Sequence, residues 1–236
     1  GCVHRADGQP RAWRDERAYI TLLTRSTDPD PGVRAAAAGA MASIADFRPQ
    51  VLELLLSLSE ANEPAAVRAE MARRGIPLIR AAAIGNETAQ RIVLRLASDA
   101  DQAVRIHLHN TLRSTLSTYS TNSRDNIHSQ PFVAELYARM AFDPEPVLAD
   151  AAGRNFTRSF SAQMQARAMA SLLEHPEPRV RLGAVEWYHS LGGVMEGWAR
   201  ADLPTRRAVE RGLLKASNSE YGGLSVFRRL LILSTD

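Results

Sequence analysis

The chain has 236 residues, and 45% of them are hydrophobic, which is enough to bury a core. Its 29 basic residues are nearly balanced by 26 acidic ones, and every basic residue except Lys215 is an arginine. The arginines are scattered rather than gathered in runs, which argues against a nucleic-acid footprint. Cys2 is the only cysteine, so an internal disulfide framework and a cysteine-based zinc site are excluded. No stretch approaches the length of about 18 apolar residues that crosses a membrane.

The first 13 residues are expected to form a polar tether, because they include Gly8 and Pro10 and show no hydrophobic period. A lone cysteine at the start of such a tether is typical of a lipoprotein whose signal peptide has been removed, so Cys2 is a candidate for lipidation. The alternative is an unmodified thiol that stands there by chance. Lipidation predicts a tethered extracytoplasmic protein, and without it a cytoplasmic location fits as well.

From residue 14 onward, apolar residues recur at helical spacing. Pro77 should kink or split one of the expected helices, and the polar segment 117–130 is expected to be a loop. Asp202 is expected to cap a further helix. The other expected helices cover residues 14–27, 33–44, 49–58, 65–79, 87–98, 104–116, 133–140, 148–156, 164–172, 180–191 and 224–233.

One phrase returns along this region: an acidic residue or a substitute, four further residues, a valine followed by an arginine, and a run of small apolar residues. Its hydrophobic anchors fall at residues 33, 67, 104, 148 and 180, at intervals of 34, 37, 44 and 32. Intervals of this size are typical of stacked helical hairpins, each of which buries its apolar face against its neighbours. The copies open with Asp28, Asn62, Asp99, Asp143 and His175.

Each part of the phrase suits the turn before a helix. An Asp or Asn side chain accepts hydrogen bonds from free backbone N–H groups, and a proline near the first helical position has no N–H to lose. The arginine lies at the edge of the buried face, where it can reach an acidic residue of its own or a neighbouring repeat. We therefore expect the opening residues to lie at turns between helices, and one row of arginines formed by Arg34, Arg68, Arg105 and Arg181.

The phrase resembles the start of the second helix in HEAT repeats, which commonly begins Asp-x4-Val-Arg. The resemblance covers roughly residues 15–236. It implies an all-α fold, a right-handed α-α superhelix (HEAT-like solenoid) of about six helical hairpins, in one domain over residues 14–236. The ladder of ion pairs that the family implies should break where the acid or the arginine is replaced, at Asn62, Ala149 and His175.

In arrays of this kind the second helix of each hairpin lines the concave side. Positions 0, +4, +8 and +11 from the anchor are apolar in most copies and should be buried, whereas positions +6 and +9 should point outward, Gly39 among them. The arginines there suit an acidic segment of another protein, because guanidinium groups bind carboxylates in bidentate fashion. The alternative is an ordinary solvated helix face. The candidate partner-binding residues are Arg73, Asn110, Arg113, Arg154, Glu186 and His189.

Catalytic motifs are missing from the sequence: it contains no P-loop, no dinucleotide-binding glycine motif, no nucleophile elbow and no zinc-protease motif. His107 and His109 stand on different sides of a helix, so they cannot bind one metal ion and are expected to be solvated or capping. We therefore expect a non-catalytic protein-protein interaction scaffold, without cofactor or metal, rather than an enzyme or a nucleic-acid-binding protein.

Two enzymatic alternatives stay open. Trp198 stands four residues before Asp202, a spacing that resembles HEAT-like alkylpurine DNA glycosylases. In such an enzyme an aromatic face would support a cationic base, and a carboxylate would stabilise an oxocarbenium-like state. Against this, Asp202 also suits a helix N-cap. The other alternative is a lyase or maturation factor of the kind that some bacterial HEAT-like proteins resemble, which a bound tetrapyrrole would reveal by its colour.

Overall fold

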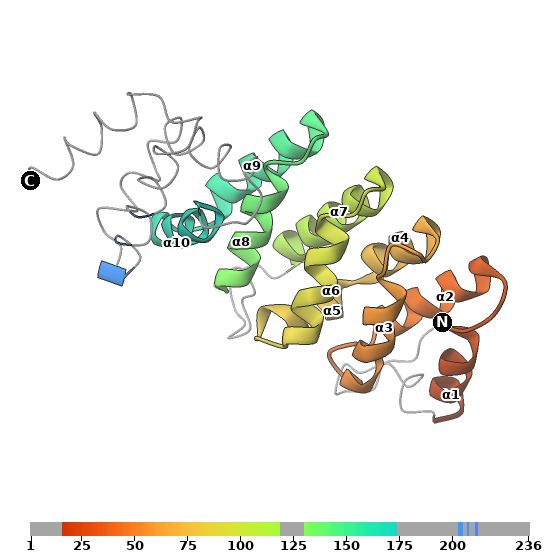
Figure 1. The fold of residues 1–236 in the computed structure, drawn as a ribbon. Helices are drawn as coiled ribbons and strands as arrows, with labels where there is room; N and C mark the ends of the chain where they lie inside the picture. Colours follow the sequence, from red (N-terminus) through yellow and green to blue (C-terminus); the bar gives the residue numbers. More distant parts are fainter. Residues whose placement is uncertain (1–15, 119–129, 174–202, 205–206, 208–210, 212–236) are drawn as a thin grey trace, which may run out of the picture. The chain divides into compact units, whose positions relative to one another are not determined.

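The computed structural model describes residues 16–118, 130–173, 203–204, 207 and 211. All regular structure within these ranges is helical, as the hydrophobic period predicts (Figure 1). The chain divides into two compact units, Gly1–Asn122 and Ser123–Asp236. The division falls inside the polar segment 117–130 that the sequence singles out as a loop. The tether and the single repeat domain over residues 14–236 stay predictions.

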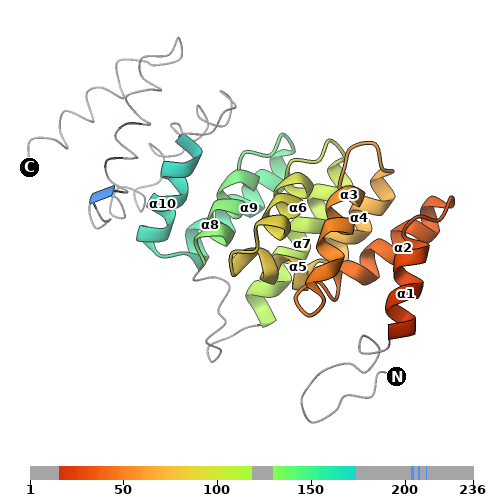
Figure 2. The ribbon, with the colours of Figure 1, turned by 60° about the horizontal axis from the view of Figure 1, so that its bottom comes forward.

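In the first unit the second helices of successive hairpins form one layer and the first helices form another (Figures 1 and 2). The helices of this unit are α1 (Glu16–Arg25), α2 (Pro31–Ala42), α3 (Leu52–Leu58) with the preceding 3-10 turn η2 (Pro49–Val51), α4 (Ala65–Arg74), α5 (Ile76–Ala83), α6 (Glu87–Ala97) and α7 (Gln102–Thr118). Helix α2 packs against α4 and α4 packs against α7, while α3 packs against α6 in the other layer. The layers are joined because α1 packs on α2 and α6 packs on α7.

Burial follows the pattern predicted from the anchors. Met71 of α4 and Leu108 of α7, each four residues after an anchor, are fully buried. Two described positions depart from the pattern, because Val33 is only half-buried and Ser159 is exposed. Helix α2 contributes small side chains, which allow α4 to approach it closely. Its small buried residues are Ala37, Ala38, Gly39 and Ala42.

The long helix expected after residue 65 is split, as Pro77 predicts. Helix α4 ends at Arg74 and α5 begins at Ile76, so Pro77 lies in the first turn of α5, where its missing N–H leaves no bond unmade. Gly75 stands between the two helices, and a Cβ atom there would lie 2.9 Å from the carbonyl oxygen of Met71. The break therefore depends on the glycine as well as on the proline.

The described part of the second unit is built around buried aromatic rings. Its helices are α8 (Pro131–Met140), α9 (Pro146–Ser159) and α10 (Ala162–Leu173), and α8 packs against both of the others. Tyr137 and Phe156 are fully buried. The ring centroids of Tyr137 and Phe160 lie 5.6 Å apart, and those of Phe156 and Phe160 lie 5.9 Å apart. These distances are typical of favourable aromatic pairs.

A poorly solvated carboxylate lies in the segment that joins α2 to η2. The Asp46 side chain is 14% exposed and one of its oxygens lies 3.5 Å from the Arg80 guanidinium. Its other oxygen, Oδ1, is buried and accepts no hydrogen bond within the described structure. Burial, partly offset by the attraction of Arg80, raises the pKa of Asp46 above its usual value.

Replacing Asp46 with asparagine should stabilise the protein at neutral pH. A folded pKa above the unfolded one means that the charged carboxylate opposes folding, and this cost develops as the pH rises above about 3.9, the usual aspartate pKa. The gain from Asp46→Asn should therefore vanish in more acidic solution. Urea denaturation of the two proteins at neutral and acidic pH measures the difference, and a less stable variant at neutral pH would contradict this account.

Candidate functional site

The acid that opens each repeat phrase shapes the turn between two helices. In three described turns its Oδ1 accepts a hydrogen bond from the backbone N–H two residues on, at 3.0 Å for Asp28–Asp30, 2.9 Å for Asp99–Asp101 and 2.8 Å for Asp143–Glu145. In two of these turns the residue two positions later caps the helix: Asp30 accepts from the Gly32 N–H at 2.7 Å, and Asp101 accepts from the Ala103 N–H at 2.8 Å. Glu145, at the N-cap of α9, makes no side-chain capping hydrogen bond. The expected place between helices is confirmed for Asp28, Asn62, Asp99 and Asp143.

The arginine of the phrase folds back onto its own turn. Arg34 donates to the carbonyl oxygens of Asp28 and Pro29 at 2.8 and 3.0 Å. In the same way Arg105 donates to the carbonyl oxygen of Asp99 at 2.7 Å, and Arg68 donates to that of Glu63. Each arginine thus fixes the path of the chain into its helix.

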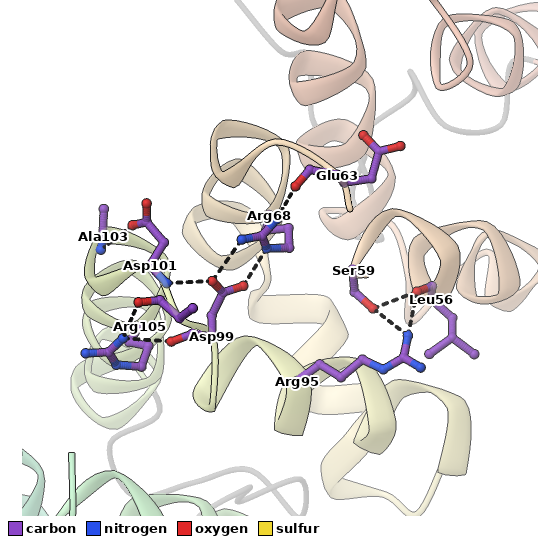
Figure 3. A network of polar contacts seen from close by, with 10 residues as sticks. Leu56, Ser59, Glu63, Arg68, Arg95, Asp99, Asp101, Ala103 and Arg105 are labelled. Atoms are coloured by element: carbon purple, nitrogen blue, oxygen red, sulfur yellow. Dashed lines mark hydrogen bonds and ion pairs between the residues drawn. The ribbon is translucent and has the colours of Figure 1, made fainter. Parts of the chain in front are cut away.

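Two of these arginines also pair with the turn of the next hairpin. The Arg68 guanidinium binds the Asp99 carboxylate with both ends of its fork, at 2.5 and 3.0 Å (Figure 3). The Arg68 and Asp99 side chains are only 8% and 6% exposed. The hydrogen bond to Asp99 raises the pKa of Arg68 above its already high value. Arg34 makes the equivalent contact to Glu63 at 3.1 Å. We call these two ion pairs the arginine ladder.

The predicted break of the ladder at Asn62 is wrong. Glu63, one residue further along the same turn, supplies the carboxylate that Asn62 lacks, and Arg34 pairs with it. A turn places two successive side chains near the preceding helix, so either position can carry the acid. The predicted breaks at Ala149 and His175 stay predictions, because the pairs of these turns lie outside the described contacts.

A further arginine links neighbouring hairpins in the layer of the first helices. Arg95 of α6 donates to the carbonyl oxygen of Leu56 at 3.0 Å and to the Ser59 hydroxyl at 3.3 Å, where α3 ends (Figure 3). A cation at a helix C-terminus is favourable because the last carbonyl groups point toward it. Neighbouring hairpins of the first unit are therefore linked by arginines in both layers.

The outward face of the second-helix layer holds three of the candidate partner-binding residues. Arg73 of α4 and Asn110 and Arg113 of α7 are exposed, as the positions +6 and +9 predict. The two helices are joined there because the Thr111 hydroxyl donates to the carbonyl oxygen of Arg73 at 3.1 Å. We call Arg73, Asn110 and Arg113 the arginine face. The same prediction is wrong for Gly39, which is buried where α2 meets α4.

Two of the candidate arginines already hold a carboxylate of their own helix. Arg73 binds Glu70 through Nε at 2.7 Å and a terminal nitrogen at 2.5 Å, and Arg154 pairs with Asp150. Among residues 16–118 no acidic side chain pairs with Arg113. These two pairs were not among the predictions from the sequence, although an acid and an arginine spaced three or four residues apart are neighbours on a helix.

Another candidate lies in the second unit. Arg154 is exposed on α9, whereas the arginine face belongs to the first unit. Several other residues that the sequence singles out lie outside the described residues: Cys2, Arg181, Glu186, His189, Trp198 and Asp202.

The described residues contain no cluster of three or more His, Cys, Asp or Glu side chains able to hold a metal ion. His109 is buried on α7, so its expected place in solvent is wrong, and a capping role stays a prediction. The reason is that α7 packs against both α4 and α6, which covers more than one stripe of the helix. None of the described helices is long and apolar enough to span a bilayer.

Comparisons with family models, with curated proteins and with solved structures found no match to this chain. The resemblance to HEAT repeats therefore stays a prediction that rests on the repeat phrase itself.

Proposed function

We propose that the chain is a HEAT-like right-handed solenoid of about six helical hairpins and acts as a non-catalytic scaffold that binds another protein. The two-layer packing of the first unit supports this proposal, as do the repeated turns with their arginine ladder. Hairpins coupled through their turns form a stiff support, and a stiff support presents an extended surface without first having to be ordered.

The arginine face is the surface that we propose for binding, and its exposure on two adjoining helices is the observation that supports this most directly. Arg73 and Arg113 project from α4 and α7, and Asn110 beside them can both donate and accept hydrogen bonds. A guanidinium matches a carboxylate in geometry and in charge. The partner that fits is therefore an acidic segment of another protein.

Replacing both Arg73 and Arg113 with glutamate should weaken binding of a fluorescein-labelled polyglutamate peptide by about tenfold or more, because two charge-assisted contacts become repulsive. Fluorescence anisotropy at low salt measures the affinity. Helix content by far-UV circular dichroism should not change, since both side chains are exposed.

Arg91→Glu is the matched control for this experiment. Arg91 is also exposed, but it lies on α6 in the other layer. Arg91→Glu therefore changes the net charge as much as Arg73→Glu or Arg113→Glu alone does, but at a different place. If Arg91→Glu loses as much affinity as each of these single variants, the peptide senses only net charge, and the arginine face is not the binding site.

A further inference from the structure

Glu70 lies between the arginine face and the neighbouring helix α2. Its carboxylate accepts three hydrogen bonds, two from Arg73 at 2.5 and 2.7 Å and one from Arg74 Nε at 2.7 Å. The Arg73 and Arg74 side chains are about half exposed, at 48% and 50%, whereas that of Glu70 is 20% exposed. One carboxylate thus occupies two guanidinium groups that would otherwise point into solvent.

A glycine of α2 makes room for this arrangement. A Cβ atom on Gly39 would lie 2.6 Å from Cγ of Glu70 and 3.1 Å from Cδ of Arg74. Both side chains therefore cross α2 at a point where any other residue would push them away. The glycine at this position therefore leaves room for the Glu70 and Arg74 side chains beside α2.

Glu70 stays charged while it binds Arg73 and Arg74. The hydrogen bond from Arg73, followed by that from Arg74, lowers its pKa below the usual glutamate value, although its partial burial acts in the opposite direction. At neutral pH the site therefore contains an ionised carboxylate bound by a forked guanidinium, which is the geometry that a partner's carboxylate would need.

We propose that Glu70 is a built-in competitor of the acidic partner: it occupies Arg73 and Arg74 in the free protein, and a carboxylate of the partner replaces it on binding. The proposal rests on the proposed function and adds a regulation to the same site. Exchange of one carboxylate for another at a half-exposed arginine is easy, because ion pairs in contact with water are weak and both states satisfy the guanidinium. The competition lowers affinity and favours partners that present several carboxylates at once.

Glu70→Gln tests the competition, since glutamine keeps the shape and one acceptor oxygen but loses the charge. The variant should bind labelled polyglutamate about two- to fivefold more tightly than the unchanged protein does in the same anisotropy titration. Glu87→Gln is the control. Glu87 is an exposed glutamate of α6, so its replacement changes the net charge equally without freeing Arg73.

The outcomes separate the two proposals. If Glu70→Gln binds no more tightly than Glu87→Gln while Arg73→Glu/Arg113→Glu still weakens binding, the arginine face stands and the competition is refuted. If polyglutamate binds neither the unchanged protein nor Glu70→Gln, both proposals fail. Tighter binding by Glu70→Gln that is lost again when Arg73→Glu is added supports the competition.

Discussion

Replacing Arg68 with alanine should destabilise the protein by about 3–5 kcal/mol, because the change leaves the buried Asp99 carboxylate without its cation. Asp99 would keep only the N–H of Asp101 as a donor, with its side chain 6% exposed. A lone charge in such a place is far more costly than the loss of the ion pair itself. Urea denaturation followed by far-UV circular dichroism measures the free energy of unfolding.

Two comparisons identify the cause of this loss. Arg34→Ala removes the same residue from the preceding hairpin, but Arg34 and Glu63 are 18% and 23% exposed, so we expect a smaller loss of about 1–2 kcal/mol. Asp99→Asn in the Arg68→Ala background removes the unpaired buried charge and keeps an acceptor for the Asp101 N–H. This double variant should recover part of the stability. Equal losses for Arg68→Ala and Arg34→Ala would show that burial of the pair is not what matters.

The turns could be predicted from the sequence because their chemistry is local. An aspartate accepts from the N–H two residues on whatever surrounds it, so the spacing Asp28–Asp30 repeated at Asp99–Asp101 is a reliable sign. The partner of each arginine is not local. Arg34 finds Glu63 rather than Asn62 because of how one hairpin sits on the next, and the phrase alone does not contain that register.

The arginine face could be predicted only in part. Helical periodicity places Arg73 and Arg113 outward, since an anchor valine and its period define the buried stripe. The same argument fails for Gly39, because α2 packs against both α1 and α4 and therefore has more than one buried stripe. The ion pair between Arg73 and Glu70 was predictable from the sequence, because a glutamate three residues before an arginine is within its reach on any regular helix.

The sequence shows an interruption of the repeats where the two units divide, but it does not show that this interruption is a boundary between compact units. The interval of 44 between the anchors at 104 and 148 marks an insertion, and the polar segment 117–130 accounts for it. Whether a loop of that kind separates two compact units depends on contacts across it, which periodicity does not report.

Replacing Phe156 with alanine should destabilise the second unit by about 3–5 kcal/mol, the usual range for deleting a buried aromatic ring. Phe156 is fully buried, and its ring centroid lies 5.9 Å from that of Phe160, which in turn meets Tyr137. A cavity beside these rings removes the contacts on which α8 and α9 depend.

Phe132→Ala is the control for this change. Phe132 lies on α8 of the same unit but is only half-buried, so its loss opens no closed cavity and should have a much smaller effect. Thermal denaturation gives the overall change, and hydrogen exchange should show the loss of protection concentrated in α8, α9 and α10 rather than in α2, α4 and α7. If Phe156→Ala and Phe132→Ala lower stability equally, or if protection falls evenly in both units, the aromatic cluster is not the core that stabilises the second unit on its own.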